Sequence, residues 1–169
     1  YFIQGKFLER REKLLNDFNE TSLKKKDASK RQLYARVLLA GACLSEDQKR
    51  LKSDVERFSD INDPDVDGYI DFLYFMAWAH SILGNSESFN NYQNKFRDII
   101  IEKGLTHSWE NEYFIGTYLI AAYYQKDWGK VLSKFREYSE SHSGQLFREF
   151  TQDKKCEAEF YLKKYDLAM

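Results

Sequence analysis

The chain holds a single proline, Pro64, and eight glycines among its 169 residues. Proline breaks an α-helix because its ring fixes φ and removes a hydrogen-bond donor, so most of this sequence has nothing to interrupt a helix. Apolar residues recur at helical spacing along these stretches, and no segment alternates at period two for long enough to indicate a sheet. The sequence therefore predicts an all-α protein.

Turn and capping signals divide the chain into expected helices. The segment Ser45-Glu46-Asp47-Gln48 has the form of a capping box, in which the serine oxygen accepts a hydrogen bond from a backbone N–H three residues on. Gly104 suits a left-handed helix end, and Ser108 and Asp127 suit helix starts. The expected helices lie at about 7–18, 31–44, 48–58, 70–83, 86–103, 109–125, 128–138 and 145–165.

Four tight turns recur at a nearly constant interval. They lie at Gly5-Lys6, Glu46-Asp47, Gly84-Asn85 and Lys126-Asp127, which are steps of 41, 38 and 42 residues. Each of the last three turns joins two expected helices. Helix pairs of this length cannot bury their apolar faces alone, so we expect each pair to stack on its neighbours.

Two segments resemble the tetratricopeptide-repeat family. They run from Ala77-Trp78-Ala79 through Leu83-Gly84-Asn85 to Phe89, and from Ala121-Ala122-Tyr123-Tyr124 through Lys126-Asp127-Trp128 to Val131 and Phe135. They match the small residues of the first helix, the polar turn and the apolar anchors of the second. The chain departs from the family in its period of about 40 instead of about 34, in Phe89 and Val131 where alanine is usual, and in lacking the terminal proline of each repeat.

The resemblance implies a right-handed superhelical stack of antiparallel helix pairs, an α-solenoid, closed by a C-terminal capping helix. We expect one domain, with a partial repeat over 1–26, repeats over 27–62, 63–104 and 105–143, and the cap over 144–169. The polar outer face of the cap is expected to carry the charged residues Lys154, Lys155, Glu157, Glu159, Lys163 and Lys164. Because the chain begins at Tyr1 and not at methionine, we expect it to be a piece of a longer protein.

The resemblance also implies a concave groove lined by the first helix of each repeat. Placed on the family pattern, the residues expected to contact a partner are Tyr74, Trp78, Tyr113, Thr117, Ile120 and Tyr124. A groove of aromatic and aliphatic side chains with few charges suits an apolar or amphipathic peptide.

The segment from Asp63 to Asp71 reads like the first nine positions of an EF-hand calcium loop. Carboxylates of Asp63, Asp65, Asp67 and Asp71 are the hard oxygen ligands that calcium prefers, and Gly68 suits the sharp turn. The twelfth position is Tyr74, however, where the family has a bidentate glutamate. The alternative is an ordinary helix start, because acidic residues and proline are favoured there. Both interpretations stay open, as a cation site or as a capping segment.

The remaining features argue against several function classes. Lys and Arg number 26 against 27 Asp and Glu, so the basic surface that nucleic-acid binding requires is not indicated. Cys43 and Cys156 are interpreted as reduced packing residues of a cytoplasmic protein. No apolar run is long enough to cross a membrane. His80, His107 and His142 lack metal-ligand spacing, and no catalytic motif is present, so we expect neither an enzyme nor a required cofactor.

The expected function is therefore a scaffold or adaptor that binds a protein or a peptide. The alternative is the ligand-sensing domain of a peptide-responsive bacterial transcription regulator whose DNA-binding domain lies upstream. Self-association into a homo-oligomer is a further expectation that the sequence leaves open.

Overall fold

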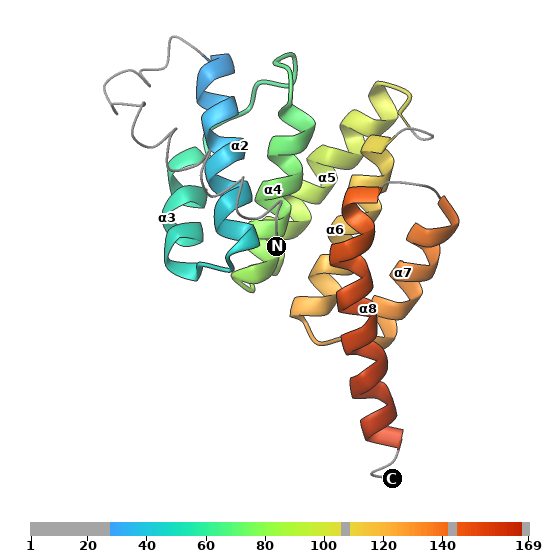
Figure 1. Ribbon diagram of the computed structural model, residues 1–169. Coiled ribbons are helices and arrows are strands. Elements are labelled where there is room, and N and C mark those ends of the chain that lie inside the picture. Colours follow the sequence, from blue (N-terminus) through green and yellow to red (C-terminus); the bar gives the residue numbers. More distant parts are fainter. Residues whose placement is uncertain (1–27, 106–108, 142–144, 167–169) are drawn as a thin grey trace. The chain divides into compact units, whose positions relative to one another are not determined.

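The computed structural model describes residues 28–105, 109–141 and 145–166. The described residues form helices and contain no strand, which confirms the all-α prediction (Figure 1). The helices are α2 (Ala28–Leu44), α3 (Gln48–Phe58), α4 (Tyr69–Ile82), α5 (Ser86–Glu102), α6 (Trp109–Tyr124), α7 (Trp128–Ser141) and α8 (Gln145–Asp166). Among these residues, none of the helices is long and apolar enough to span a lipid bilayer.

The expected helix over 7–18, the turn at Gly5-Lys6, the cap at Ser108 and the break at 142–144 lie outside the described residues. The other expected helices are present with ends shifted by a few residues. The largest changes are that α2 begins at Ala28, three residues before its expected start, and that α7 continues to Ser141 instead of ending near Tyr138.

Three expected turns share one backbone geometry. After α2, α4 and α6 a single residue adopts a positive φ, namely Glu46 at 51°, Gly84 at 68° and Lys126 at 58°. The residue that follows donates its backbone N–H to the carbonyl five positions earlier, as in a Schellman motif. This bond satisfies a carbonyl that the helix end would otherwise leave without a donor.

The same residue then caps the next helix. The side chains of Asp47, Asn85 and Asp127 each accept a hydrogen bond of 3.1 Å from the backbone N–H three residues on. The expected capping box at Ser45 is therefore wrong by two residues. The Ser45 hydroxyl instead donates to the carbonyl of Gly41 at the end of α2, at 2.9 Å, because the left-handed Glu46 separates Ser45 from the start of α3.

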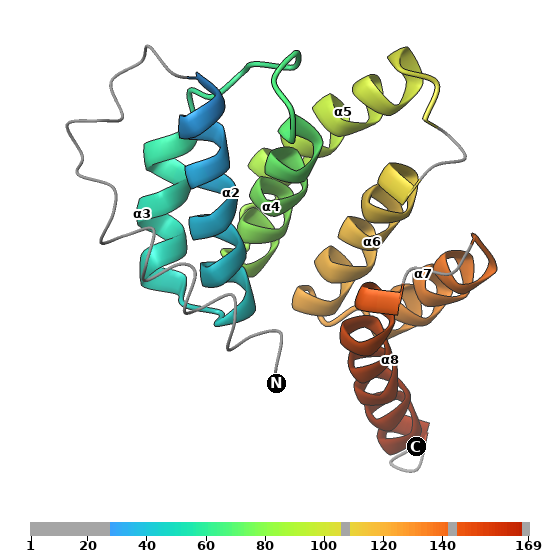
Figure 2. The ribbon, with the colours of Figure 1, turned by 45° about the horizontal axis from the view of Figure 1, so that its top comes forward.

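The described chain divides into two compact units, and the boundary falls inside α5 between Tyr92 and Gln93. In the first unit, α2 packs against both α3 and α4 (Figure 2). Leu51, Val55 and Phe58 are spaced four and three residues apart and form the apolar buried face of α3. The Phe58 ring meets Tyr34 of α2 edge-on with centroids 6.0 Å apart, and the guanidinium of Arg31 pairs with the carboxylate of Asp60 just beyond α3.

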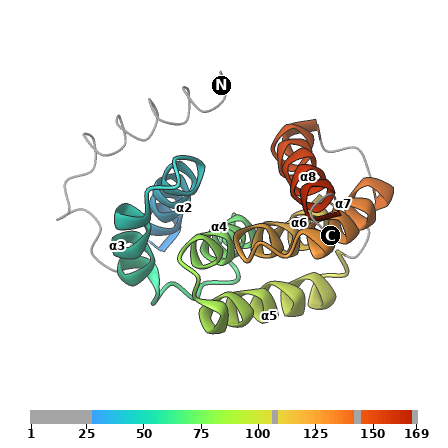
Figure 3. The ribbon, with the colours of Figure 1, turned by 90° about the horizontal axis from the view of Figure 1, so that it is seen from below.

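In the second unit, α7 packs against both α6 and α8, and α8 also touches α6 (Figure 3). A small buried cluster joins the three helices and consists of Ala122, Val131 and Ala158. The two alanines permit a close approach of the helix backbones, since a longer side chain at either position would hold the axes apart.

The helices differ in how their apolar residues are distributed. In α3 the apolar residues form one stripe and the opposite side is exposed, as in a surface helix. In α4 nearly every residue from Phe72 to Ile82 is buried, on all sides of the helix. A helix that is apolar all round is expected to be a central element, and α4 therefore lies in the core of the first unit.

Candidate functional site

Two residues predicted to line a groove lie in α4 and are buried. The side chains of Tyr74 and Trp78 are 2% and 4% exposed. Their rings contact one another at 5.8 Å and both contact the half-buried ring of Phe75, at 5.1 Å and 6.2 Å. Their burial means that these two rings do not present an accessible surface. The sequence did not indicate this burial, because α4 is apolar all round and its pattern does not mark which side faces a partner. A role of the two rings in binding stays a prediction.

The predicted groove residues of α6 follow the same pattern. Thr117 and Ile120 are fully buried, and the Thr117 hydroxyl oxygen accepts a hydrogen bond from the side-chain amide of Gln93. Thr117 in turn donates to the carbonyl of Phe114 at 2.6 Å. The side chain of Tyr113 lies outside the described residues, and Tyr124 is half-buried. Tyr124 is thus the only one of the six with a described and partly accessible side chain.

The aspartates of the calcium-like loop are not brought together. Asp71 pairs with the guanidinium of Arg36, which also lies directly against Gly68. Among the described residues, no three His, Cys, Asp or Glu side chains form a group that could hold a metal ion. Asp63, Asp65 and Asp67 are exposed and precede α4, whose N-cap is Gly68 without a side-chain cap hydrogen bond.

Burial is the main cause of the shifted pKa values of His80 and Tyr92 in the first unit. His80 stacks on Tyr92 with ring centroids 5.4 Å apart, and burial lowers the pKa of its imidazole. The Nδ1 atom of His80 has no hydrogen-bond partner among the described residues. Burial, then the nearby Tyr69 and Asp60, raise the pKa of Tyr92 to about 12. His80 is therefore a neutral packing residue at neutral pH.

The two cysteines differ in environment and lie far apart in the sequence. Cys43 is buried, and its Sγ lies 3.7 Å from the carbonyl oxygen of Phe75. Burial, followed by the charge of Asp54, raises the pKa of the Cys43 thiol well above its ordinary value, which disfavours the reactive thiolate. Cys156 is free and exposed on α8. The packing role predicted for both cysteines therefore holds for Cys43 and not for Cys156.

The second unit carries a continuous series of partly accessible rings. Tyr124 meets Tyr123 at 5.2 Å and 85°, Tyr123 meets Trp128 at 5.9 Å and 70°, and Trp128 stacks on Tyr161 at 4.8 Å and 9°. All four rings are half-buried. We call these four residues the aromatic row. It runs from the end of α6, across the turn into α7, to Tyr161 in the C-terminal third of α8.

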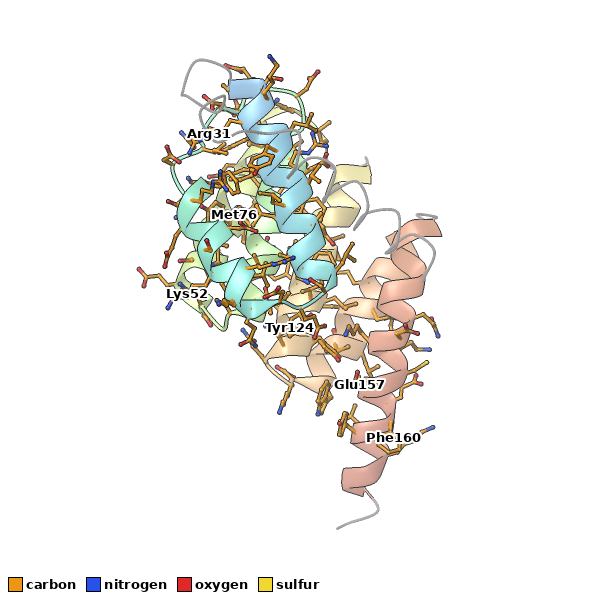
Figure 4. The ribbon with its side chains drawn as sticks, turned by 60° about the vertical axis from the view of Figure 1, so that its left-hand side comes forward. Arg31, Lys52, Met76, Tyr124, Glu157 and Phe160 are labelled. Atoms are coloured by element: carbon orange, nitrogen blue, oxygen red, sulfur yellow. The ribbon has the colours of Figure 1, made fainter. Side chains whose placement is uncertain are left out.

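Charged groups of α8 border the aromatic row. The ammonium of Lys154 lies 3.8 Å from the ring centroid of Tyr123 and 6.0 Å from that of Tyr124. The Tyr123 hydroxyl donates to a carboxylate oxygen of Glu157 at 2.6 Å. Figure 4 shows Tyr124 and Glu157 on α6 and α8 of this unit. The row is therefore held in place by a cation–π contact and a charge-assisted hydrogen bond.

These contacts correct the expected polar face of the capping helix. Lys154 and Glu157 point toward α6, and the ammonium of Lys155 lies 5.2 Å from the ring centroid of Phe135 on α7. The physical reason is that lysine has a long apolar stem, which covers neighbouring rings while its charged end stays near water. The charge pattern alone therefore wrongly predicted that these side chains point outward.

Placed on the family pattern, both Tyr123 and Tyr124 fall on the expected groove, whereas Trp128 and Tyr161 were not assigned to it. Tyr123 and Trp128 stand beside the Lys126-Asp127 turn, and that proximity was a usable signal. No sequence signal marks Tyr161, because its contact with Trp128 depends on how α8 packs on α7. Comparison with family models, with curated proteins and with solved structures finds no match for this chain.

Proposed function

We propose that this chain is a binding module for a protein or peptide segment, and that the aromatic row is its contact surface. The observation that carries the proposal is the continuity of four half-buried rings from three successive helices. Tyrosine and tryptophan contribute most to binding energy at protein interfaces, because each adds a large rigid area and a polar group.

The surroundings of the row support the same role. The contacts of Lys154 and Glu157 with Tyr123 fix the ring before a partner arrives, which lowers the entropy lost on binding. Apolar ring faces bordered by one cationic and one anionic side chain suit an amphipathic segment with an apolar anchor.

We further propose that the helix pairs stack in the manner of tetratricopeptide repeats. The three equivalent turns, each with a left-handed residue followed by an Asp or Asn cap, support this arrangement. In such a stack α8 has the place of a terminal cap, consistent with its packing on α7 and α6.

The test is affinity capture from lysate of the source organism with the chain as bait, read by quantitative mass spectrometry. Tyr124→Ser removes one ring of the row. Tyr118→Ser is the matched control, because Tyr118 is also a half-buried tyrosine of α6 but contacts Phe114 and Lys134 instead of the row. We expect a specific partner to be recovered with the wild type and with Tyr118→Ser, and to be lost with Tyr124→Ser.

Once a partner has been identified, its affinity for the wild type and for each variant can be measured. A ring that acts as a hot spot contributes at least about 2 kcal/mol, so Tyr124→Ser should weaken the measured affinity by roughly 30-fold. Circular dichroism melts of both variants confirm that they fold. Equal affinities for the two variants would show that the partner binds elsewhere on the chain.

A further inference from the structure

The helix α8 has two faces of different character. Ala158 faces inward and is fully buried against Ala122 and Val131. Asp153, Cys156, Phe160 and Lys163 are all exposed and are spaced three, four and three residues apart. At 3.6 residues per turn these four lie within about 80° of each other and opposite Ala158. We call them the outward stripe of α8.

A large apolar residue stands in the middle of this stripe. Phe160 is 63% exposed, and the other exposed large apolar residues among those described, Leu33 and Ile101, are on different helices. Figure 4 shows Phe160 on the part of α8 that extends past the ends of α6 and α7. Within the second unit, another helix can therefore lie alongside the stripe without meeting α6 or α7.

The charges at the two ends of the stripe favour one relative direction for a second helix packed against it. The stripe has Asp153 at one end, Lys163 at the other, and its spacing is symmetric about position 158. When a second copy lies antiparallel, Asp153 of each copy faces Lys163 of the other and Phe160 faces Cys156. In a parallel pair, Asp153 would face Asp153 and Lys163 would face Lys163, which is unfavourable for both charges.

We propose that the outward stripe of α8 pairs antiparallel with the same stripe of a second copy of this chain. The interface is isologous, with two Phe160–Cys156 contacts at its centre and an Asp153–Lys163 ion pair at each end. The spacing of three and four residues is that of the a and d positions of a coiled coil, which lets side chains of facing helices interdigitate.

The dimer is expected to be weak and dependent on concentration. A stripe of about three helical turns covers less than the roughly 800 Å² per partner of a standard stable interface. Its ion pairs are exposed, so high salt should weaken them. The stripe borders the aromatic row, because the Phe160 ring meets the Tyr161 ring edge-on with centroids 5.7 Å apart, but the inference does not depend on the proposed function.

The first test is sedimentation velocity of the wild-type chain over a wide range of concentration. We expect a reversible monomer–dimer equilibrium that Phe160→Ser weakens by at least tenfold. Ile101→Ser is the matched control, since Ile101 is 64% exposed but lies on α5, and it should leave the equilibrium unchanged. A wild-type chain that stays monomeric at millimolar concentration would overturn the proposal, and so would equal effects of the two substitutions.

The second test distinguishes antiparallel pairing from any other contact through Phe160. Asp153→Lys and Lys163→Asp each create like charges across the proposed interface, so each alone should weaken the dimer. The variant that carries both substitutions restores opposite charges at both ends and should recover wild-type dimerisation. Additive weakening in the double variant would contradict the antiparallel arrangement.

The two surfaces can be tested apart. Asp153→Lys should weaken the dimer and keep the captured partner, because it changes neither the aromatic row nor Phe160, whose ring touches Tyr161 of the row. Tyr124→Ser should lose the partner and keep the dimer. Failure of either prediction thus leaves the other proposal standing.

Discussion

The imidazole of His80 is buried against the Tyr92 ring, and this burial links the stability of the fold to pH. Its pKa is lowered in the folded state, so between that lowered value and the ordinary value of about 6.5 the unfolded chain binds a proton that the folded chain does not. The contribution to stability is therefore full above about pH 6.5 and is lost as pH falls through the folded pKa.

We predict that His80→Gln makes the free energy of unfolding less dependent on pH between about 5 and 6.5 than it is in the wild type. The measurement is urea unfolding at several pH values in that window, where most carboxylates stay ionised in both chains. The comparison uses the slope of the free energy of unfolding against pH, so a cost of the substitution that is the same at every pH does not affect it. Parallel curves for the two chains would mean that His80 is protonated equally in the folded and unfolded states.

A second residue-scale prediction concerns Gly68, whose φ is 84°. An alanine in the left-handed region costs roughly 1–2 kcal/mol, and at this position its Cβ would also overlap the Arg36 guanidinium. Gly84 has a φ of 68° and open space around it, so Gly84→Ala measures the backbone cost alone. Gly68→Ala should therefore lower the free energy of unfolding by more than Gly84→Ala does.

Arg36 explains the expected difference and provides its control. In a chain with Arg36→Ala, the clash at Gly68 is removed while the backbone strain remains. The costs of Gly68→Ala and Gly84→Ala should then become similar. A difference that persists without Arg36 would place its origin in the backbone of the loop.

At the scale of elements, the turns were the most predictable part of the fold. Their signals are local, because a left-handed residue followed by Asp or Asn satisfies the ends of two helices within a few positions. The one error, a cap at Ser45 instead of Asp47, arose because both residues are good caps and the left-handed conformation of Glu46 decides between them.

The cap of α7 provides a prediction at this scale. Asp127→Ala removes the acceptor for the backbone N–H of Lys130 and should cost about 1 kcal/mol of unfolding free energy. Asp127→Asn keeps an acceptor oxygen at the same position, so it should lower the unfolding free energy by only a few tenths of the loss caused by Asp127→Ala. Thermal and urea unfolding measure both variants. If alanine and asparagine cost the same, the lost charge at the helix start is the cause and not the hydrogen bond.

The candidate site was far less predictable than the turns. Periodicity identifies an inward face only where a helix has a polar face to compare it with, and α4 has almost none. The roles of Tyr74, Trp78, Thr117 and Ile120 depended on that choice of face. The contact of Tyr161 with Trp128 depends instead on tertiary packing between segments about thirty residues apart, which no local pattern encodes.

At the scale of the whole molecule, the all-α class followed from the scarcity of proline and from the helical spacing of apolar residues. The division into two compact units within α5 did not follow, because a helix that continues across a boundary leaves no composition shift or linker in the sequence. Stacking of the helix pairs stays a prediction, and so does a partner for the aromatic row.

The two most apolar helices are α4 and α6. Their places along the chain have a consequence for folding during synthesis on the ribosome. The partners α2 and α3 precede α4 in the chain, and Tyr92 of α5, which contacts His80 of α4, follows the end of α4 by about ten residues, so α4 finds its partners soon after it emerges. The partners of α6 are α7 and α8, and about forty residues must still be translated before both are made, which takes roughly two to eight seconds. During that interval α6 is covered in part, where Gln93 and Phe96 of α5 contact it. The side of α6 that packs on α7 and α8 stays uncovered, and nascent-chain crosslinking should find chaperones there and not on α4.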